Sequence, residues 1–469
     1  MGNTLFDKLW DLHTIAELDG GETLLLIDRV FLHERTGSIA LQSLAEKGRK
    51  VRNPSHVFCT MDHIVDTFPG RGDETLMPSG KEFIEATRAE TAAAGIKLFD
   101  IGDPHQGIIH VVSPEQGIAL PGQTLVCPDS HSCTLGGLGA LAWGIGSTDA
   151  EHAMATGTLR KQKPLNMRVN YEGGLPAGTG AKDMILHLIG SYSAAGGIGY
   201  AVEFSGPAIS ALSVEARMTL CNMAVEFSAF TGIIAPDDKT IEFTRGRNFA
   251  PTEDQWEQAV EHWKTLYSDP DASFDREISI DCSDIRPAVT WGTSPQHTVA
   301  IDGIVPSPDG EPETEKRNAM IRALEYMGLS PGISMSDIPI DAAFIGSCTN
   351  ARISDLRLAA EFLQGKQVAT GVRAVVVPGS TLVKKAAEAE GLDRIFSDAG
   401  FEWRESGCSM CFYAGGETFG AGKRVISSTN RNFEGRQGPQ TRTHLASPLT
   451  VAASAVAGFF RESGKGAVE

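Results

Sequence analysis

Apolar stretches of strand length alternate with amphipathic stretches along the first third of the chain. Residues 23–32 and 123–129 are mostly apolar and end at a polar residue or a turn, which predicts buried strands. Residues 80–96 carry a weakly apolar stripe at helical spacing and predict a helix, while residues 97–102 and 107–112 predict two further strands. This alternation favours α/β layers with largely parallel sheets.

The same alternation continues through the middle of the chain. Residues 165–173 predict a strand that runs into Gly- and Pro-rich turns. Residues 181–197 and 212–230 predict helices, and residues 276–283 and 287–295 predict strands. A second α/β region therefore follows the first.

An acidic segment with three prolines, residues 305–316, is the clearest linker. After it, residues 340–350 and 373–380 predict strands, which alternate with helices predicted for residues 353–365 and 381–392. We therefore expect an α/β protein with three consecutive domains. The expected domains are residues 1–165, 166–304 and 305–469.

The charge and the cysteine content narrow the function classes. With 41 basic and 59 acidic side chains the formal charge is −18, and the field of such a chain repels the phosphates of nucleic acids. The start of the chain resembles neither a secretory signal nor a targeting segment, and no apolar run reaches the length of a membrane span. We therefore expect a cytoplasmic protein without nucleic-acid or membrane partners. In that reducing compartment the eight cysteines are thiols or metal ligands.

Three cysteines form the first candidate site. Cys408 and Cys411 stand in a C-x-x-C pair, and Cys348 ends a predicted strand after a small-residue turn. A C-x-x-C pair alone also fits a redox pair, half of a zinc site or a purely structural pair. Closed structural sites normally have four ligands, whereas three leave a metal with an open position. Three thiolates on a [4Fe-4S] cluster would leave one iron free to bind a hydroxyl group as a Lewis acid.

Histidines close to carboxylates form a second candidate site in the first expected domain. Asp62 precedes His63, His110 lies within the strand predicted for residues 107–112, and Asp129 lies two residues before His131. A single histidine after a strand is more often a structural residue than a catalytic one. Three of them with acids nearby favour catalysis, because an imidazole oriented by a carboxylate can deliver a proton to a leaving hydroxyl near neutral pH.

Two further features fit the binding of an anion. Glu203 closes an apolar strand and could orient a histidine, although it also fits a solvated strand end. Arg431 and Arg436 lie in a polar, glycine-bearing loop at residues 428–438. Arginine presents a planar fork that matches a carboxylate, so this loop could hold an anionic substrate; ordinary surface arginines are the alternative.

Two glycine-rich stretches do not match nucleotide-binding motifs. Residues 174–183 lack the Gly-Lys-Ser/Thr end of a phosphate loop. Residues 194–204 enter a strand rather than leaving one for a helix, which is the wrong order for a dinucleotide fingerprint. We therefore expect no nucleotide at either stretch.

Several motifs, taken in order, resemble those of the aconitase superfamily. They are MDH, DSH, GSCTN, GCSMC and NRNFEGRQG. Within the superfamily, DRVFLHE, DPHQGIIHVVSPEQG, MTLCNMAVE, TWGTSPQ and THLASP are similar to motifs of isopropylmalate isomerase large subunits. The resemblance covers nearly the whole chain. It implies three α/β/α domains of the aconitase large-subunit type around a central [4Fe-4S] cluster, and an enzyme that moves a hydroxyl group by dehydration and rehydration.

The resemblance also implies roles for individual residues. The cluster ligands of the family are matched by Cys348, Cys408 and Cys411. The pair that protonates the leaving hydroxyl is matched by Asp62 and His63. The supporting histidine–carboxylate pairs are matched by His110 with Asp129 and by His131 with Glu203. The positions of the substrate environment are matched by His33, Ser130, Thr134, Asn430, Arg431 and Arg436.

A separate small subunit completes the enzymes of this family. It carries a fourth domain and the serine base that takes the proton from carbon, and no segment of this chain matches that base. The resemblance therefore implies a heterodimer or heterotetramer acting on a small hydroxy-dicarboxylate, with isomerisation of 2- and 3-isopropylmalate in leucine biosynthesis as its reaction. Cys133, Leu135 and Tyr200 depart from the residues usual in these isomerases. Therefore 2-methylmalate/citraconate and dimethylmalate are alternative substrates.

Two readings come from other classes of protein. Some aconitase relatives bind RNA when their cluster is lost, but the charge of −18 and the lack of a basic stripe argue against this reading. A zinc-stabilised structural protein could use the same cysteines, but it leaves the histidine–carboxylate pairs and the arginine loop unexplained.

Overall fold

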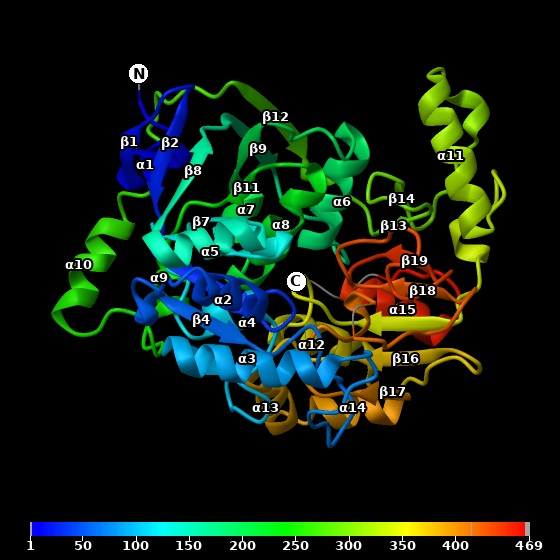
Figure 1. Cartoon of the computed structure of the whole chain (residues 1–469). Coiled ribbons are helices and arrows are strands. Elements are labelled where there is room, and N and C mark those ends of the chain that lie inside the picture. The colour runs from blue at the N-terminus through cyan, green and yellow to red at the C-terminus, as the bar shows by residue number, and fades with distance from the viewer. Residues whose placement is uncertain (1, 414, 465–469) are drawn as a thin grey trace. The chain divides into compact units, whose positions relative to one another are not determined.

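The computed structural model describes residues 2–413 and 415–464. The chain forms two compact units, each assembled from separate stretches of sequence (Figure 1). Unit 1 comprises Met1–Val65, Pro78–Gly174 and Gly197–Asp281. Unit 2 comprises Asp66–Met77, Leu175–Gly196 and Cys282–Glu469. Both units are built on parallel sheets, which confirms the predicted α/β class. The division into three consecutive domains stays a prediction.

The first sheet of unit 1 has the strand order β5-β4-β3-β6-β7, and every pairing in it is parallel. Its strands are β3 (Arg29–His33), β4 (Val57–Thr60), β5 (Lys97–Phe99), β6 (Thr124–Cys127) and β7 (Leu141–Gly144). Every residue of β4 and β6 is buried, as expected for strands covered on both faces. The rings of Phe31, Phe58 and Phe99 pack together in the core beside this sheet.

Two further sheets belong to unit 1. The parallel sheet β11-β10-β9-β12 is formed by β9 (Leu165–Glu172), β10 (Tyr200–Ser205), β11 (Thr231–Ile233) and β12 (Arg276–Asp281). The antiparallel sheet β1-β2-β8 is formed by β1 (Thr14–Glu17), β2 (Glu22–Leu26) and β8 (Thr158–Gln162).

The helices of unit 1 alternate with these strands along the chain. They are α1 (Leu5–His13), α2 (Gly37–Glu46), α3 (Gly80–Ala94), α4 (Ile109–Glu115), α5 (Ser147–Thr156), α7 (Pro207–Ala211), α8 (Val214–Asn222), α9 (Asp238–Thr244) and α10 (Asp254–Trp263). The 3-10 turns are η1 (Pro54–His56), η2 (Ser130–Leu138) and η3 (Met223–Phe227). Helix α2 packs against α3, α5 and β3 (Figure 1).

Unit 2 is centred on a five-stranded parallel sheet with the order β17-β16-β15-β18-β19. Its strands are β15 (Ala342–Ile345), β16 (Arg373–Val376), β17 (Phe401–Trp403), β18 (Arg424–Ser427) and β19 (Arg442–Leu445), and β13 (Ala288–Thr290) pairs with β14 (Thr298–Ala300). Its α-helices are α6 (Ala181–Tyr192), α11 (Thr314–Met327), α12 (Ile353–Leu363), α13 (Thr381–Ala389), α14 (Leu392–Ala399) and α15 (Pro448–Ala457). Its 3-10 turns are η4 (Cys282–Asp284), η5 (Pro308–Gly310), η6 (Met335–Asp337) and η7 (Ser409–Cys411).

Two apolar runs differ from their predicted structure. Residues 23–32 form two strands in different sheets rather than one, because the Asp28 carboxylate accepts a hydrogen bond from the Thr124 N–H and interrupts the run. Residues 107–112 contain the start of helix α4 instead of a strand, and the N–H of Ile109 donates to the Asp62 carboxylate. Periodicity cannot separate a short buried helix from a buried strand.

Two predicted helical segments also need correction. The helix predicted over residues 212–230 begins at Val214 and changes to the 3-10 turn η3 at Met223. Helix α11 begins at Thr314, inside the predicted linker. Among the described residues, no helix is both long enough and apolar enough to cross a membrane.

A close backbone approach within unit 1 makes Gly136 a sharp test of this packing. A Cβ at Gly136 would lie 1.8 Å from the carbonyl oxygen of Gly232. Gly136→Ala should therefore destabilise the chain by about 1–3 kcal/mol or more, because the backbone must move apart. The matched control is Gly146→Ala, since a Cβ at Gly146 would have no neighbouring atom within 4 Å and the φ there is an ordinary −80°. Urea denaturation of both variants checks this; equal stabilities would contradict the packing.

Candidate active site

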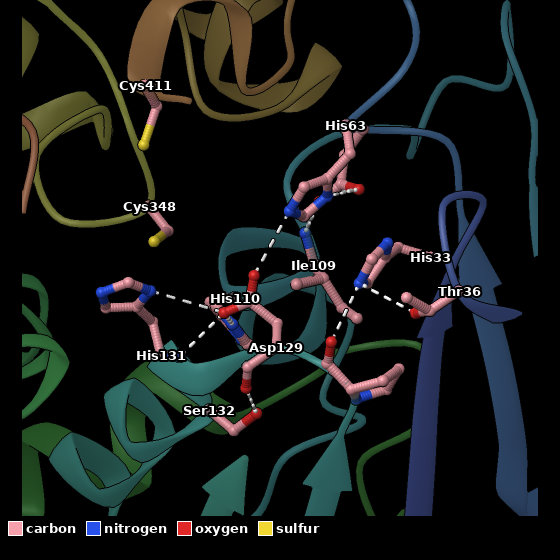
Figure 2. A network of polar contacts seen from close by, with 12 residues as sticks. His33, Thr36, His63, Ile109, His110, Asp129, His131, Ser132, Cys348 and Cys411 are labelled. Carbon is pink, nitrogen blue, oxygen red and sulfur yellow. Dashed lines mark hydrogen bonds and ion pairs between the residues drawn. The ribbon is translucent and has the colours of Figure 1, made fainter. Parts of the chain in front are cut away.

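The histidine–carboxylate residues of unit 1 gather at the carboxyl ends of β3, β4 and β6 (Figure 2). His33 is the last residue of β3, Asp62 follows the end of β4 by two residues, and Asp129 follows the end of β6 by two residues. Parallel strands end at the same edge of a sheet, which is where α/β proteins place their ligands. Helix α4 adds His110 from the segment that was predicted as a strand.

Asp129 is the centre of this group. Its Oδ1 lies 3.0 Å from Nε2 of His110 and 3.5 Å from Nδ1 of His131, and its Oδ2 lies 3.3 Å from Nε2 of His63. Burial raises the pKa of Asp129, but hydrogen bonds from His110, His131 and His63 outweigh it and hold the pKa well below its ordinary value. One ionised carboxylate therefore orients three imidazoles.

His63 lies between two carboxylates. Its Nδ1 donates to Asp62 Oδ1 at 2.6 Å, while its Nε2 faces Asp129. Burial raises the pKa of Asp62, but the charge and hydrogen bond of His63 outweigh this effect and lower the pKa. The His63 side chain is 11% exposed, whereas that of His110 is 1% exposed. His63 is therefore the better placed of the two to exchange a proton with a bound molecule.

Glu34 holds the backbone that carries this pair. Its carboxylate accepts the N–H groups of Asp62 at 3.0 Å, His63 at 2.7 Å and Ile64 at 2.5 Å. Burial and the charge of Asp62 raise the pKa of Glu34 to about 7. All three N–H groups donate to one fully buried side chain, and these hydrogen bonds fix the turn after β4.

His33 completes the group by stacking. Its ring lies against that of His63, with 4.1 Å between the ring centroids. Its Nε2 lies 3.2 Å from the Pro128 carbonyl oxygen and 3.3 Å from Oγ1 of Thr36. Burial, together with the charge of His63, lowers the pKa of His33 to about 4. His33 is therefore neutral at physiological pH, and its ring supports that of His63.

The predicted partner of His131 is wrong. His131 Nε2 lies 3.0 Å from Oε1 of Glu226, whereas Glu203 accepts a hydrogen bond from Ser268 Oγ at 2.6 Å. Glu226 lies in the 3-10 turn η3, which packs against the turn η2 that carries His131. Glu203 lies in the middle of β10, a strand of the other parallel sheet of unit 1. No sequence spacing distinguishes the two acids.

The last residue of α8, Asn222, also lies beside this site, although no role was predicted for it from the sequence. Asn222 Nδ2 donates to Thr134 Oγ1 at 2.8 Å, and Thr134 Oγ1 donates to the His131 carbonyl oxygen at 2.5 Å. Asn222 and Glu226 both belong to MTLCNMAVE, a motif quoted above only for its family resemblance. That motif was the signal that could have found them. Ser130 begins η2 and is half-buried.

The cysteines of unit 2 lie at the carboxyl ends of its strands. Cys348 follows β15 after Ser347, which has a φ of +82°, and both Cys348 and Cys411 are buried. Cys411 Sγ donates to Ser347 Oγ at 3.0 Å, Asn430 Nδ2 donates to Cys348 Sγ at 3.5 Å, and Arg436 Nη2 donates to Cys411 Sγ at 3.8 Å. Such donors stabilise a thiolate.

Glu417 fixes the turn that carries the cysteine pair. Its carboxylate accepts from Ser409 Oγ at 2.7 Å and from the Thr67 N–H at 2.6 Å. Ser409 lies directly after Cys408, in a turn where its φ is +47°. The strained turn is therefore tied to the segment Asp66–Met77, which belongs to the same unit.

The arginine loop follows β18. Arg436 is buried, and its guanidinium lies over the ring of Phe412 at 4.5 Å, which excludes an ordinary surface arginine. Its Nε is buried without a hydrogen-bond partner in the described structure, so it has a donor left for a ligand. Asn430 and Arg431 are adjacent at the start of the loop, with Arg431 half-buried. Their roles toward substrate stay predictions.

The chemistry around the three predicted ligands fits an iron–sulfur cluster. Thiolates are the ligands that such clusters select. The N–H···S donors from Asn430 to Cys348 and from Arg436 to Cys411 are typical of cluster environments.

The family model for "Aconitase family (aconitate hydratase)" matches residues 7–458. The chain belongs to the aconitase family. It is thus an enzyme of the hydro-lyase class, which adds water to a substrate or removes it.

Known proteins give two further comparisons for this aconitase-family chain. It is 53% identical over 457 residues to 3-isopropylmalate dehydratase large subunit 1 of Bradyrhizobium diazoefficiens, covering 97% of this chain and 95% of that protein. The crystal structure of the holo-form of Thermococcus kodakaraensis aconitase X matches 91% of this chain and 89% of its own, with 14% identity and a TM-score of 0.47.

The two acids near His131 give a paired prediction. Glu226→Gln should lower kcat/KM for dehydration about ten- to a hundred-fold, because a hydrogen bond to a charged group contributes about 1.5–3 kcal/mol. Glu203→Gln should stay within about threefold of the parent, since Glu203 contacts Ser268 instead. Steady-state kinetics of dehydration compare the two variants with the parent. The reverse order would restore the pairing predicted from sequence.

The buried His33 predicts a pH dependence of stability. Its pKa is about 4 when folded and about 6.5 when unfolded, so between these values the unfolded chain binds more protons. The free energy of unfolding should therefore fall as the pH drops from about 6.5 to about 4, by up to about 1.4 kcal/mol per pH unit from this group. Urea titrations across this range should show a shallower fall for His33→Gln. Equal slopes would contradict a buried, neutral His33.

Proposed function

We propose that this chain is the large subunit of a 3-isopropylmalate dehydratase, which interconverts 2- and 3-isopropylmalate by dehydration and rehydration in leucine biosynthesis. The observation that carries the proposal is the 53% identity over 97% of the chain to a large subunit of that name. The Asp129-centred imidazoles and the buried cysteines supply the two chemical parts that such a reaction needs.

The first part, the group of imidazoles, delivers a proton to the leaving hydroxyl. His63 is held between two carboxylates, and Asp62 orients its ring through Nδ1. A proton held at Nε2 of His63 can pass to a hydroxyl leaving from carbon, and Asp129 stabilises the charge on the ring before the transfer. His110 and His131, which share Asp129, keep that carboxylate ionised.

The second part binds the metal group and the substrate anion. Cys348, Cys408 and Cys411 would hold a [4Fe-4S] cluster, which when bound supplies a Lewis acid for the hydroxyl oxygen. The unused Nε of the buried Arg436 suits a substrate carboxylate, with Asn430 and Arg431 beside it in the same loop. The substrate is thus proposed to be a small hydroxy-dicarboxylate.

A base that removes the proton from carbon has not been assigned in this chain. The imidazoles are committed to the hydroxyl, and arginine is too basic to accept a proton at neutral pH. We therefore propose a small subunit that supplies the base, in a heterodimer or heterotetramer. The relative's name, which calls it a large subunit, supports this arrangement. A biosynthetic enzyme of this kind also suits the cytoplasm.

Two of the three sequence departures, Cys133 and Leu135, give no reason to propose a different substrate. Cys133 and Leu135 are fully buried, Leu135 within the core of unit 1, and Cys133 Sγ donates to the Asn222 carbonyl oxygen at 3.5 Å. Residues in the core change a site less directly than residues that line it. Isopropylmalate therefore stays the first proposal, and 2-methylmalate/citraconate and dimethylmalate are outcomes that the test below can reveal.

The test combines metal analysis with activity. Anaerobic reconstitution should give about four iron and four sulfide per chain, whereas zinc without sulfide would contradict the proposal. With candidate small subunits and a panel of 2- and 3-alkylmalates, turnover should be fastest with isopropylmalate and absent without the small subunit. Faster turnover of 2-methylmalate or dimethylmalate would change the substrate and keep the reaction type. Dehydration by the chain alone would refute the two-subunit arrangement.

Cysteine variants separate the ligands from the other thiols. Cys348→Ser, Cys408→Ser and Cys411→Ser should each lose cluster and activity together, because each removes one thiolate. The matched control is Cys282→Ser, a change at another buried cysteine, which should retain the cluster absorbance and most of the activity. Full activity in Cys408→Ser would contradict the assignment of the ligands.

A further inference from the structure

The glycine-rich segment at residues 174–183, which matches no nucleotide motif, ends by placing two charged residues in the interior of unit 2. Lys182 and Asp183 lie in the first turn of α6, and both are fully buried. The Asp183 carboxylate accepts the N–H groups of Ala288 at 2.8 Å and of Gly180 at 3.0 Å. Asp183 thus has a structural partner set of its own, and Lys182 needs a separate account.

Lys182 points to the backbone just before the arginine loop. Its Nζ donates to the carbonyl oxygens of Ser428 at 2.9 Å and of Thr429 at 2.5 Å. The next residue, Asn430, donates through Nδ2 to Cys348 Sγ. Lys182 therefore binds the carbonyl group of Thr429, the residue directly before Asn430, and Asn430 contacts a predicted cluster ligand.

No carboxylate neutralises Lys182 directly. In the described part of the chain, none lies within 4.0 Å of its Nζ. The acid that acts on it most strongly is Asp355, whose oxygens accept from the Asn350 side chain at 2.9 Å and from the Arg352 N–H at 3.0 Å. The next strongest attraction is to Cys411, followed by those to Asp183 and Cys348.

Two arginines near the predicted ligands, like Lys182, are buried without a carboxylate partner for their side chains in the described structure. Arg352 is buried and donates to the Thr349 carbonyl oxygen at 2.9 Å, directly after Cys348 in the chain. Arg436 is buried and donates to Cys411 Sγ. Neither has a carboxylate within ion-pair distance among the described residues. Two buried arginines thus donate directly to the backbone or the sulfur atom at the cysteine turns.

A buried cation without a nearby anion is costly, and proteins pair such charges or bind an anionic group to them. Burial lowers the pKa of Lys182 to about 7, which reflects this cost. Three thiolates on a [4Fe-4S] cluster carry net negative charge, which can balance a buried cation such as Lys182.

We propose that Lys182 is the buried counter-charge of the cysteine-bound cluster, so that cluster and lysine stabilise one another within unit 2. This inference rests on the proposed function, because it needs the cluster. It assigns Lys182 a positioning role that acts through electrostatics: the cation retains the cluster and sets its reduction potential. The merely structural alternative is that Lys182 only pins the carbonyl groups of Ser428 and Thr429.

The experiment compares the parent, Lys182→Gln and Lys182→Met in complex with the small subunit after anaerobic reconstitution. Both variants remove the charge, and the glutamine keeps an N–H donor for the carbonyl groups. The midpoint potential of the cluster should shift to more negative values in both, because a lost positive charge disfavours electron uptake. In air, the visible absorbance of the cluster should decay about tenfold faster in both variants.

The cluster-free proteins give the sharpest contrast. Without a cluster, Lys182→Gln should have a Tm equal to or above that of the parent, because it buries no unpaired cation. With the cluster, its Tm should fall below that of the parent. If Lys182 were purely structural, its substitution would lower Tm both with and without the cluster, and this outcome would overturn the proposal. A midpoint potential and a decay time equal to those of the parent would also overturn it.

The matched control removes a buried cation from the other unit. Arg217 is fully buried and pairs with Asp237. Arg217→Gln should lower Tm equally with and without the cluster and leave the midpoint potential unchanged; a shifted potential would show that the readout is not specific to Lys182. If the parent itself takes up no iron and sulfide, the proposed function fails. If it does and the Lys182 variants behave like the parent, only this inference fails.

Discussion

The chemistry of unit 1 depends on one buried carboxylate that must find partners for its charge. Asp129 is ionised in the interior because His63, His110 and His131 all donate to it, and in return it fixes the direction of each ring. If the charge were removed, the imidazoles would lose their common anchor, and His63 would no longer be held for proton transfer. A single electrostatic requirement thus explains why residues distant in sequence converge.

The parallel sheet makes that convergence possible. β3, β4 and β6 are neighbours, so the residues that follow their carboxyl ends meet at one edge. The buried carboxylate of Glu34 accepts hydrogen bonds from consecutive backbone N–H groups after β4 and so fixes the positions of Asp62 and His63. The geometry of the candidate site is therefore fixed by the strands and also by the Glu34 carboxylate.

The same logic, with opposite charge, applies within unit 2. There three buried cations, Lys182, Arg352 and Arg436, have carbonyl or sulfur partners instead of a paired carboxylate. Such cations suit the proposed anionic cluster and anionic substrate. They would provide local positive charge in a chain with a formal charge of −18.

The reaction class, and a set of candidate residues for it, could be predicted from the order of amino acids alone. Cysteine and histidine are rare enough, and their chemistry specific enough, that Cys348, Cys408, Cys411 and the histidines next to Asp62 and Asp129 could be picked out by residue type. The α/β class followed from the alternation of apolar and amphipathic stretches. Family motifs then supplied the roles that single residues could not.

Which acid meets which base is settled by packing between distant segments. Glu203 and Glu226 are equivalent in a sequence pattern, and the packing of η3 on η2 selects Glu226 as the partner of His131. Long-range pairing also determines that residues 107–112 begin a helix, since Asp62 binds the N–H of Ile109 at its start. The interior position of Lys182 is hidden in the same way. The burial of a residue and the identity of its partners depend on contacts between distant segments, which the local sequence pattern does not encode.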